Sequence, residues 1–385
     1  MKSGLEDVVA AETILSDVDG LAGRLIMRGV SLDDLAGTPY EQVLSLLWTG
    51  FFELPQDLPG ALARARTEVF AHVAGADASL EPVDAVRALM ALIPDGNDLE
   101  TALRLVAAPA VFTPAVLRLK SGQQPVAPRP GLGHAADILH MLTGKTPSPQ
   151  QAAALDAYLV TVADHGLNAS TFTARVVAST GAGLTSAVLA ALGALKGPLH
   201  GGAPGPVLDM LDAIGTPANA EPWLDAALTR GDRLMGFGHR IYRVRDPRAD
   251  ALKLALRPLI AAGEVDKDRV ALAEAVETAA LALLKRKKPD RPLETNVEFY
   301  TALLLEALGF PRSAFTCVFT MGRTGGWIAH AREQAATGRL IRPQSRYVGP
   351  APLQAAETPV THRSLLTTTL SPPPDFPGRR AGAHG

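Results

Sequence analysis

Apolar residues recur at helical spacing along most of this chain. Alanine, leucine and arginine dominate these runs, and glycine, proline or aspartate lies between them. The first three residue types favour helices, whereas the others interrupt them. Strand patterns are scarce, so the sequence predicts a mainly α-helical protein. The main helices are predicted at 40–48, 59–73, 82–93, 99–119, 148–163, 266–287, 296–308 and 315–334.

Other stretches depart from this pattern. β-branched and apolar residues flank a turn signal at Asp17 to Gly20, so 5–28 is predicted to form a short β-hairpin. The stretch 170–195 is apolar on nearly every face, which is typical of a helix buried at the centre of a protein or at a subunit interface. The tail from Ala351 is rich in proline, and its last residues are predicted to be poorly ordered.

The composition is that of a soluble globular protein, with 47% hydrophobic and 20% charged residues among 385. That length allows more than one domain. A net charge of −2 gives no support to a nucleic-acid partner. We expect a cytoplasmic protein without a membrane partner, because no signal peptide is visible and no apolar run approaches membrane-spanning length. The single cysteine, Cys317, lies in an apolar run and is interpreted as a core residue.

Two histidines stand out because each lies in a glycine-flanked turn. His200 belongs to GPLHGGAPGP, and His239 belongs to GFGHRIY and is followed by a basic run up to Arg248. Glycine lets the backbone approach a ligand closely, and a histidine there can present a ring nitrogen to a carbonyl. Pro204 predicts a helix start, whose positive end would keep the ring of His200 neutral. The pattern indicates a pocket that polarises carbonyls and holds an anionic substrate.

These two segments resemble the signatures LHGGAN and GFGHRVY…DPR of the citrate synthase family. Four further segments match in the family's order: DHGLNASTF, NVEFY, GRTGGWIAH and RLIRPQSRYVGP. With the N-terminal segment, the resemblance covers nearly the whole chain up to about Pro352. It implies a two-domain helical fold with a short N-terminal β-hairpin. The large domain would comprise 1–202 and 310–385, and the small domain, 203–309, would close over the site between them.

The resemblance also implies an acyltransferase and the roles of its residues. A citrate synthase joins acetyl-CoA to oxaloacetate and hydrolyses the citryl thioester to citrate and coenzyme A. The thioester is a substrate, and no tightly bound cofactor is expected. The implied catalytic residues are His200, which donates to the thioester carbonyl, His239, which contacts the ketone, and the base Glu298. The implied substrate-binding residues are His165, Asn168, Arg248, Arg323 and Arg342, and those for coenzyme A are Arg243, with Arg245 and Arg240 as weaker candidates. Arg342 would reach the partner's site, which implies a homodimer.

The chain departs from the family at three positions. Glu298 replaces the catalytic aspartate, Pro204 replaces an asparagine, and Gly166 replaces a glutamate. Glutamate is one methylene longer, which can move the carboxylate by about 1 Å and the rate by about a hundredfold. Two alternatives therefore accompany citrate synthase: a 2-methylcitrate synthase that uses propionyl-CoA, and a non-catalytic paralogue that binds acyl-CoA. The arginines that match the family's carboxylate-binding residues argue against the paralogue.

Taken alone, several of these residues have simpler interpretations. Arg243 and Arg248 are typical of a surface, and Glu298 of a solvated helix start. Arg323 is different, because its neighbours look buried and a buried arginine needs an anionic partner. No segment has metal-ligand spacing, so no metal is predicted. The remaining histidines of interest are assigned to structure: His134, His140 and His330.

Overall fold

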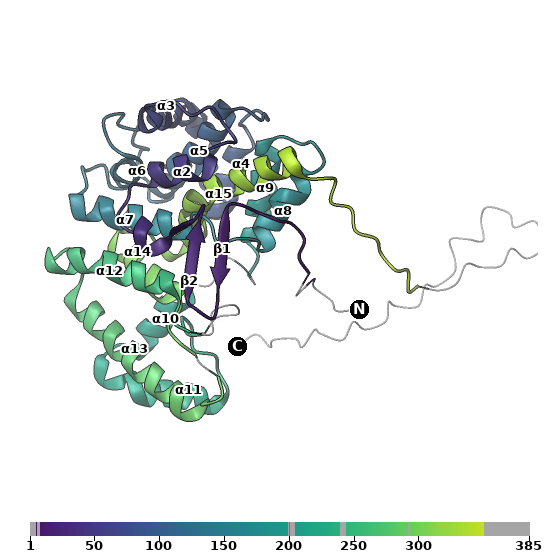
Figure 1. Ribbon diagram of the computed structural model, residues 1–385. Coiled ribbons are helices and arrows are strands. Elements are labelled where there is room, and N and C mark those ends of the chain that lie inside the picture. The colour runs from purple at the N-terminus through teal and green to yellow at the C-terminus, as the bar shows by residue number, and fades with distance from the viewer. Residues whose placement is uncertain are drawn as a thin grey trace, which may run out of the picture. The chain divides into compact units, whose positions relative to one another are not determined.

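The computed structural model describes residues 5, 8–198, 200, 205–238, 244–291 and 293–349. The chain divides into two compact units, Met1–Ile341 and Arg342–Gly385. Of the second unit, only 342–349 are described, and these form neither helix nor strand. The first unit is mainly α-helical, as predicted (Figure 1). The predicted large and small domains both include parts of this unit, and their boundaries stay predictions, as does the order of the tail, which lies outside the described residues.

The predicted N-terminal hairpin is present and has a third short strand. β1 (Ser16–Asp19) pairs antiparallel with β2 (Arg24–Met27), and β2 pairs with β3 (Val30–Ser31). The turn follows Asp19 instead of centring on the predicted signal. The Asp19 carboxylate accepts the N–H groups of Leu21 and Ala22, and Gly23 has a left-handed φ of 63°. The aspartate thus ends the strand and starts the turn.

Helix α6 was not predicted, whereas the helices predicted before residue 163 are present to within a few residues, apart from the end of α3. Here the chain changes to the 3₁₀ turn η1 (Ala71–Gly75). Side-chain caps fix several starts, and Ser148 forms a full capping box with Gln151. The helices are α1 (Leu32–Leu35), α2 (Tyr40–Trp48), α3 (Leu58–Phe70), α4 (Pro82–Met90), α5 (Leu99–Lys120), α6 (His134–Thr143) and α7 (Pro149–Val162).

The apolar stretch 170–195 forms two helices instead of one. α8 (Ala169–Ala178) and α9 (Leu184–Leu195) are separated by a short turn in which Gly181 has φ 84°. This left-handed conformation suits glycine and ends the first helix. The two helices pack against each other, so each covers part of the other's apolar surface. The prediction of a single helix here is wrong because all-round hydrophobicity does not reveal a turn.

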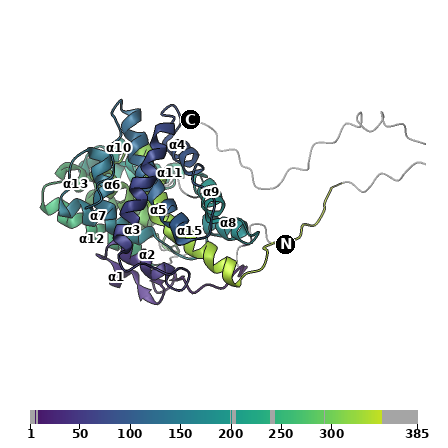
Figure 2. The same cartoon turned by 90° about the horizontal axis from the view of Figure 1, so that it is seen from above.

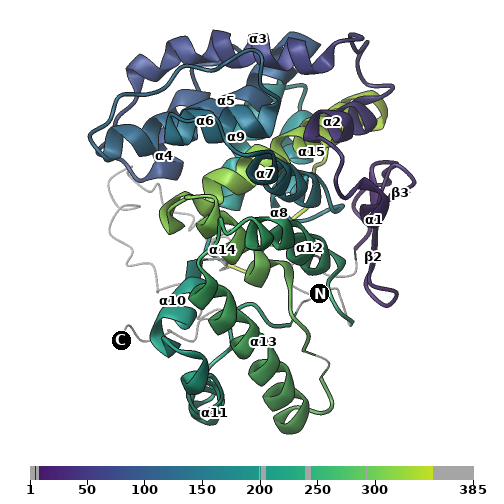
Figure 3. The same cartoon turned by 90° about the vertical axis from the view of Figure 1, so that its left-hand side faces the viewer.

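Within this unit, α10, α11 and α13 extend away from the earlier helices (Figure 3). α11 packs on α13, and α10 packs on α13 and α14, while α12 joins this group to α7. These elements are α10 (Gly205–Ile214), η2 (Pro217–Asn219), α11 (Ala220–Arg230), α12 (Pro247–Ala261), α13 (Lys267–Lys287), α14 (Val297–Ala307), η3 (Arg312–Ala314) and α15 (Phe315–Thr337).

α5 corrects the expectation that no apolar run reaches membrane-spanning length. By length and composition alone, this helix is long and apolar enough to cross a membrane. However, 83% of its apolar window is buried inside the protein. It packs against α3, α4, α6, α9 and α15, which is the surrounding of a core helix.

α15 is the helix around which the unit is packed, and it contacts α2, α5, α8 and α9 in addition to α7 (Figure 2). Two glycines let it lie directly on the end of α7. A Cβ at Gly326 would lie 2.2 Å from the carbonyl oxygen of Ala163, and one at Gly322 would lie 3.0 Å from that of Leu159. The backbones of the two helices are therefore in direct contact here, which sets the distance between α15 and the end of α7.

Two side chains of α2 hold α15 from the other side. The hydroxyl of Tyr40 donates to the carbonyl oxygen of Gly322 at 2.8 Å, and the indole of Trp48 donates to that of Gly325 at 3.0 Å. Both side chains are fully buried. The segment from Gly322 to Gly326 is thus fixed both in position and in rotation, which matters because Arg323 lies within it.

Replacing Gly326 by alanine should destabilise the protein. The new methyl group would clash with a backbone oxygen that cannot rotate away, and overpacking of this kind costs about 1–3 kcal/mol. Urea unfolding measures the change. The control is Gly193→Ala in α9, where nothing lies within 4 Å of the new Cβ and alanine should stabilise the helix by roughly 0.5–1 kcal/mol. Equal effects of the two substitutions would contradict the close approach of α15 to α7.

Candidate active site

The turn between α7 and α8, residues 163–168, forms one wall of the site. Asn168 caps α8, because its amide oxygen accepts the N–H groups of Ser170 and Thr171 at 3.0 and 3.1 Å. Its amide nitrogen donates to the carbonyl oxygen of Gly166 at 3.3 Å. Gly166 has φ 76°, a conformation that a side chain disfavours. In this chain, the departure from the family at position 166 therefore has a backbone reason.

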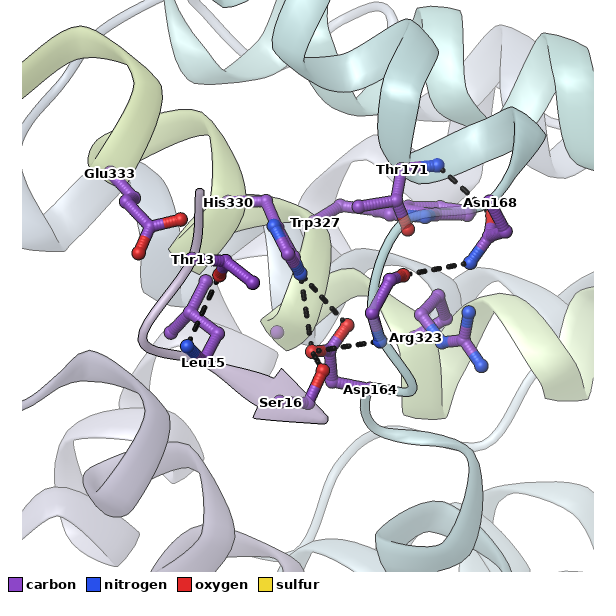
Figure 4. A network of polar contacts seen from close by, with 12 residues as sticks. Thr13, Leu15, Ser16, Asp164, Asn168, Thr171, Arg323, Trp327, His330 and Glu333 are labelled. Carbon is purple, nitrogen blue, oxygen red and sulfur yellow. Dashed lines mark hydrogen bonds and ion pairs between the residues drawn. The ribbon is translucent and has the colours of Figure 1, made fainter. Parts of the chain in front are cut away.

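Asp164 anchors this turn in a buried polar network (Figure 4). Its carboxylate accepts the hydroxyl of Ser16 at 2.5 Å and lies 3.1 Å from Nε2 of His330. Burial opposes its ionisation, but the hydrogen bonds from His330 and Ser16, together with the charge of Arg323, outweigh burial and lower the pKa of Asp164. The carboxylate is therefore ionised at neutral pH. The N-terminal strand and α15 are both joined to the turn through it.

Arg323 is fully buried on α15 and is only partly paired. Its Nε donates to the carbonyl oxygen of Val162, and its guanidinium lies 4.8 Å from the ring centre of Phe319. Among the described residues, its Nη1 and Nη2 have no hydrogen-bond partner. Burial lowers the pKa of Arg323 to about 10, which still leaves it charged at neutral pH. A buried cation with two unpaired donors calls for an anion, and a carboxylate fits this fork.

His165 and His200 are both half-buried beside this arginine. Burial, aided by the charges of Arg323 and Arg248, lowers the pKa of His165 well below its usual value. Burial and Arg323 also lower the pKa of His200. Its ring is therefore expected to be neutral, with burial and a neighbouring cation as the causes, while the predicted contribution of a helix dipole stays a prediction. A neutral imidazole can donate a hydrogen bond to a carbonyl.

The hydroxyl of Ser170 connects His200 to α8 and α15. It lies 2.9 Å from Nε2 of His200 and accepts the indole N–H of Trp327 at 3.2 Å. Its single proton has two acceptors within reach, since the amide oxygen of Asn168 lies at 2.8 Å. When Ser170 donates to Nε2, the neutral ring of His200 carries its proton on Nδ1. Nδ1 is then the ring nitrogen that can donate a hydrogen bond to a carbonyl group of a ligand.

Arg248 and Glu298 come from the starts of two neighbouring helices. Arg248 is buried at the start of α12, and its Nε and Nη2 contact the two carboxylate oxygens of Asp246 at 3.0 and 2.9 Å. Asp246 also accepts the N–H of Val297, the first residue of α14. Glu298 follows, half-buried, and burial raises its pKa against the attraction of Arg248 and Arg233. A carboxyl with a raised pKa suits a base that works near neutral pH.

Electrostatic interactions join these five side chains. The charge of Arg323 acts on both histidines, and Arg248 acts on His165, Arg323 and Glu298. They come from the α7–α8 turn, position 200, α12, α14 and α15. The arrangement combines two cations for an anionic ligand, two neutral imidazoles and one carboxyl. This is a set of groups suited to proton transfer beside a carbonyl.

The other predicted site residues are placed differently or lie outside the description. Asn168 adjoins the site, but the bonds of its amide are those of the helix cap. Arg245 ion-pairs with Asp250 and lies 3.8 Å from Glu277, contacts that a phosphate would have to displace. The coenzyme A role of Arg245 therefore stays a prediction. Arg342 belongs to the second unit. His239, Arg240 and Arg243 lie outside the described residues, as does Pro204.

Ser170, Trp327, Asp164 and Arg175 were missed by the sequence analysis. The signal was present in Arg175, a charged residue within an apolar run. His330 was assigned to structure and lies in the Asp164 network.

Two other residues that the sequence analysis assigned to structure are placed as predicted. His134 lies 3.1 Å from Arg66 in a buried cluster, and burial raises the pKa of Cys317 to about 12. The described part of the chain contains no group of three His, Cys, Asp or Glu residues placed to hold a metal ion.

Comparison with known proteins gives a family match over most of the chain. The family model described as "Citrate synthase, C-terminal domain" matches residues 4–344. A citrate synthase of Haloferax volcanii is 39% identical, over 94% of this chain and 99% of its own length. A 2-methylcitrate synthase of Mycobacterium tuberculosis is 38% identical, over 91% of each chain. The two kinds of relative are thus about equally similar.

A solved structure shares the fold over nearly the whole chain. The citrate synthase of Thermoplasma acidophilum superposes with a TM-score of 0.80 at 28% identity, and the match covers 92% of this chain and 97% of that one. The solved structure of that protein is a ternary complex with carboxymethyl coenzyme A and oxaloacetate.

Proposed function

Because the chain belongs to the citrate synthase family, whose members are enzymes that transfer acyl groups, we propose that it condenses acetyl-CoA with oxaloacetate. The products are citrate and free coenzyme A. The observation that carries the proposal is the buried guanidinium of Arg323, two of whose donors have no partner among the described residues and whose charge acts on two neutral histidines. Oxaloacetate supplies what this arrangement lacks, namely a carboxylate for the fork and a ketone to be polarised.

In the proposed reaction, Glu298 removes a proton from the methyl group of acetyl-CoA. Its raised pKa brings it closer to the working pH, and Arg248 favours the ionised form from which it must act. His200 donates to the thioester oxygen, on which negative charge develops as the C–H bond breaks. The enol carbon then forms a bond to the ketone carbon of oxaloacetate. Water cleaves the resulting citryl thioester to citrate and coenzyme A.

Arg323 holds a carboxylate of oxaloacetate in this proposal, and the positive charge of Arg248 also acts on His165. Both cations are buried, so their attraction for an anion is screened little by water. His239 would polarise the ketone, a role that rests on the resemblance alone. The assignments of Arg243, Arg245 and Arg240 to coenzyme A, and of Arg342 to the partner's site in a cytoplasmic homodimer, belong to the proposal on the same basis.

A 2-methylcitrate synthase is the second candidate, and the observation that favours it is the 38% identity to such an enzyme. Propionyl-CoA adds one methylene, which an apolar pocket distinguishes by only about 1–3 kcal/mol. The residues would keep the same roles. A non-catalytic paralogue is less well supported, because Gly166 has a backbone explanation and Glu298 has the raised pKa of a base.

Replacing Arg323 by lysine should raise the KM for oxaloacetate by about 10²-fold, because a single ammonium cannot reproduce the two-pronged contact with a desolvated carboxylate. Thiol release with acetyl-CoA and with propionyl-CoA measures the effect. The control is Arg312→Lys, which alters an exposed ion pair with Asp209 and should leave KM unchanged. An unchanged KM in Arg323→Lys would remove Arg323 from the site. No thiol release by the unmodified protein with either thioester would contradict the proposed function.

Replacing Glu298 by glutamine should lower kcat by about 10²–10⁴-fold while KM changes little, because the amide keeps the shape but cannot accept the proton. The pH profile gives a second readout. Glu298 acts in its ionised form, so kcat/KM should fall as the pH drops through its pKa. Because that pKa is raised, the fall should begin at a higher pH than for an ordinary glutamate. Full activity of the variant would show that another group is the base.

A further inference from the structure

Three buried polar side chains next to the site, Arg175, His330 and Asp164, form a hydrogen-bonded relay. Arg175 on α8 donates from Nε to Nδ1 of His330 at 3.0 Å, and Nε2 of His330 lies 3.1 Å from both oxygens of Asp164. Arg175 also binds Gln334 at 3.0 Å and forms an ion pair with Glu333. These side chains are all buried. None of them has a role in the proposed reaction.

The relay fixes the protonation of His330. An arginine Nε–H can only donate, so Nδ1 of His330 must accept and cannot carry a proton. The proton of the neutral ring is then on Nε2, where it points to the carboxylate of Asp164 (Figure 4). The charges also balance in this state, because Arg175 pairs with Glu333 and the positive charge of Arg323 acts on the negative charge of Asp164. His330 is therefore a neutral donor of fixed direction.

Asp164 is an unusual neighbour for an arginine that must bind a substrate anion. Its negative charge is the strongest attraction acting on the guanidinium of Arg323. Yet the two form no ion pair, and Nη1 and Nη2 of Arg323 have no partner in the described part of the chain. The oxygens of Asp164 are already engaged by His330 and Ser16, with the N–H of Gly166 at 3.5 Å.

We propose that His330 is a positioning residue that keeps the anion-binding fork of Arg323 open by holding Asp164 in the relay. Without the Nε2 donor, Asp164 would be a buried carboxylate with an unmet requirement for hydrogen bonds. The open Nη groups of Arg323 are the donors that would then compensate it. Such an internal pair would compete with the substrate carboxylate. The kinetic part of this inference rests on the proposed function.

Two substitutions at position 330 test the roles of the two ring nitrogens of His330 separately. Asparagine places an amide oxygen near Nδ1 and keeps the acceptor for Arg175, but it is too short to reach Asp164. Glutamine places an amide N–H near Nε2 and keeps the donor to Asp164, but it loses the acceptor. We expect His330→Asn to raise the KM for oxaloacetate about tenfold with little change in kcat, and His330→Gln to raise it by no more than about twofold.

The double variant His330→Asn with Asp164→Asn distinguishes a positioning role of His330 from a general loss of structure at the site. Removing the competing carboxylate should lower the KM for oxaloacetate back toward that of the unmodified protein, although both substitutions lower stability. A KM higher than that of His330→Asn alone would overturn the inference, as would equal KM values for His330→Asn and His330→Gln. Urea unfolding of each variant shows whether the KM values follow stability instead.

A measurement without catalysis keeps this inference separate from the proposed function. Nitrogen NMR of protein labelled with ¹⁵N-histidine should show His330 as a neutral ring with its proton on Nε2. His330→Gln identifies the signal. A proton on Nδ1, or a doubly protonated ring at neutral pH, would contradict the relay even if thiol release is normal. If the relay is present but no thiol is released, the proposed function fails and the arrangement of His330 stands.

Discussion

The burial of one guanidinium, that of Arg323, is the constraint on which the rest of the site depends. A charge at the centre of a helical core is costly unless its donors are satisfied. Within the described part of the chain, Nε is bonded to the carbonyl oxygen of Val162, and the other two nitrogens have no hydrogen-bond partner. The protein must therefore hold this side chain in place by packing around α15. A bound anionic ligand would accept hydrogen bonds from these two donors and so stabilise the folded protein. This links the stability of the fold to the proposed substrate.

The surrounding structure is arranged to keep this cation both fixed and available. Gly322 and Gly326 bring α15 onto the end of α7, while Tyr40 and Trp48 bind its carbonyl groups from α2. Burial, together with the charge of Arg323, lowers the pKa values of His165 and His200, so the arginine that we propose binds the substrate also helps to keep its neighbours neutral. Electrostatics thus couples binding to the protonation state that hydrogen-bond donation requires.

The sequence predicts most helices because their apolar spacing and capping residues are local properties. It does not predict the turn between α8 and α9, since hydrophobicity on every face hides a break. The matched motifs predict which residues approach one another, and Arg323 can be identified as buried from its neighbours. The role of His330 could not be predicted, because its partners Asp164 and Arg175 are distant in the chain. For Arg245, sequence patterns do not show that Asp250 and Glu277 already engage its charge.

A crystal structure of the protein with oxaloacetate bound would test the central claim most directly. We predict that one carboxylate of the ligand accepts hydrogen bonds from both Nη1 and Nη2 of Arg323 at about 2.7–2.9 Å, while Asp164 stays bonded to His330. The account would be contradicted if oxaloacetate bound elsewhere, or if Arg323 paired with a carboxylate of the protein while the ligand occupied the site.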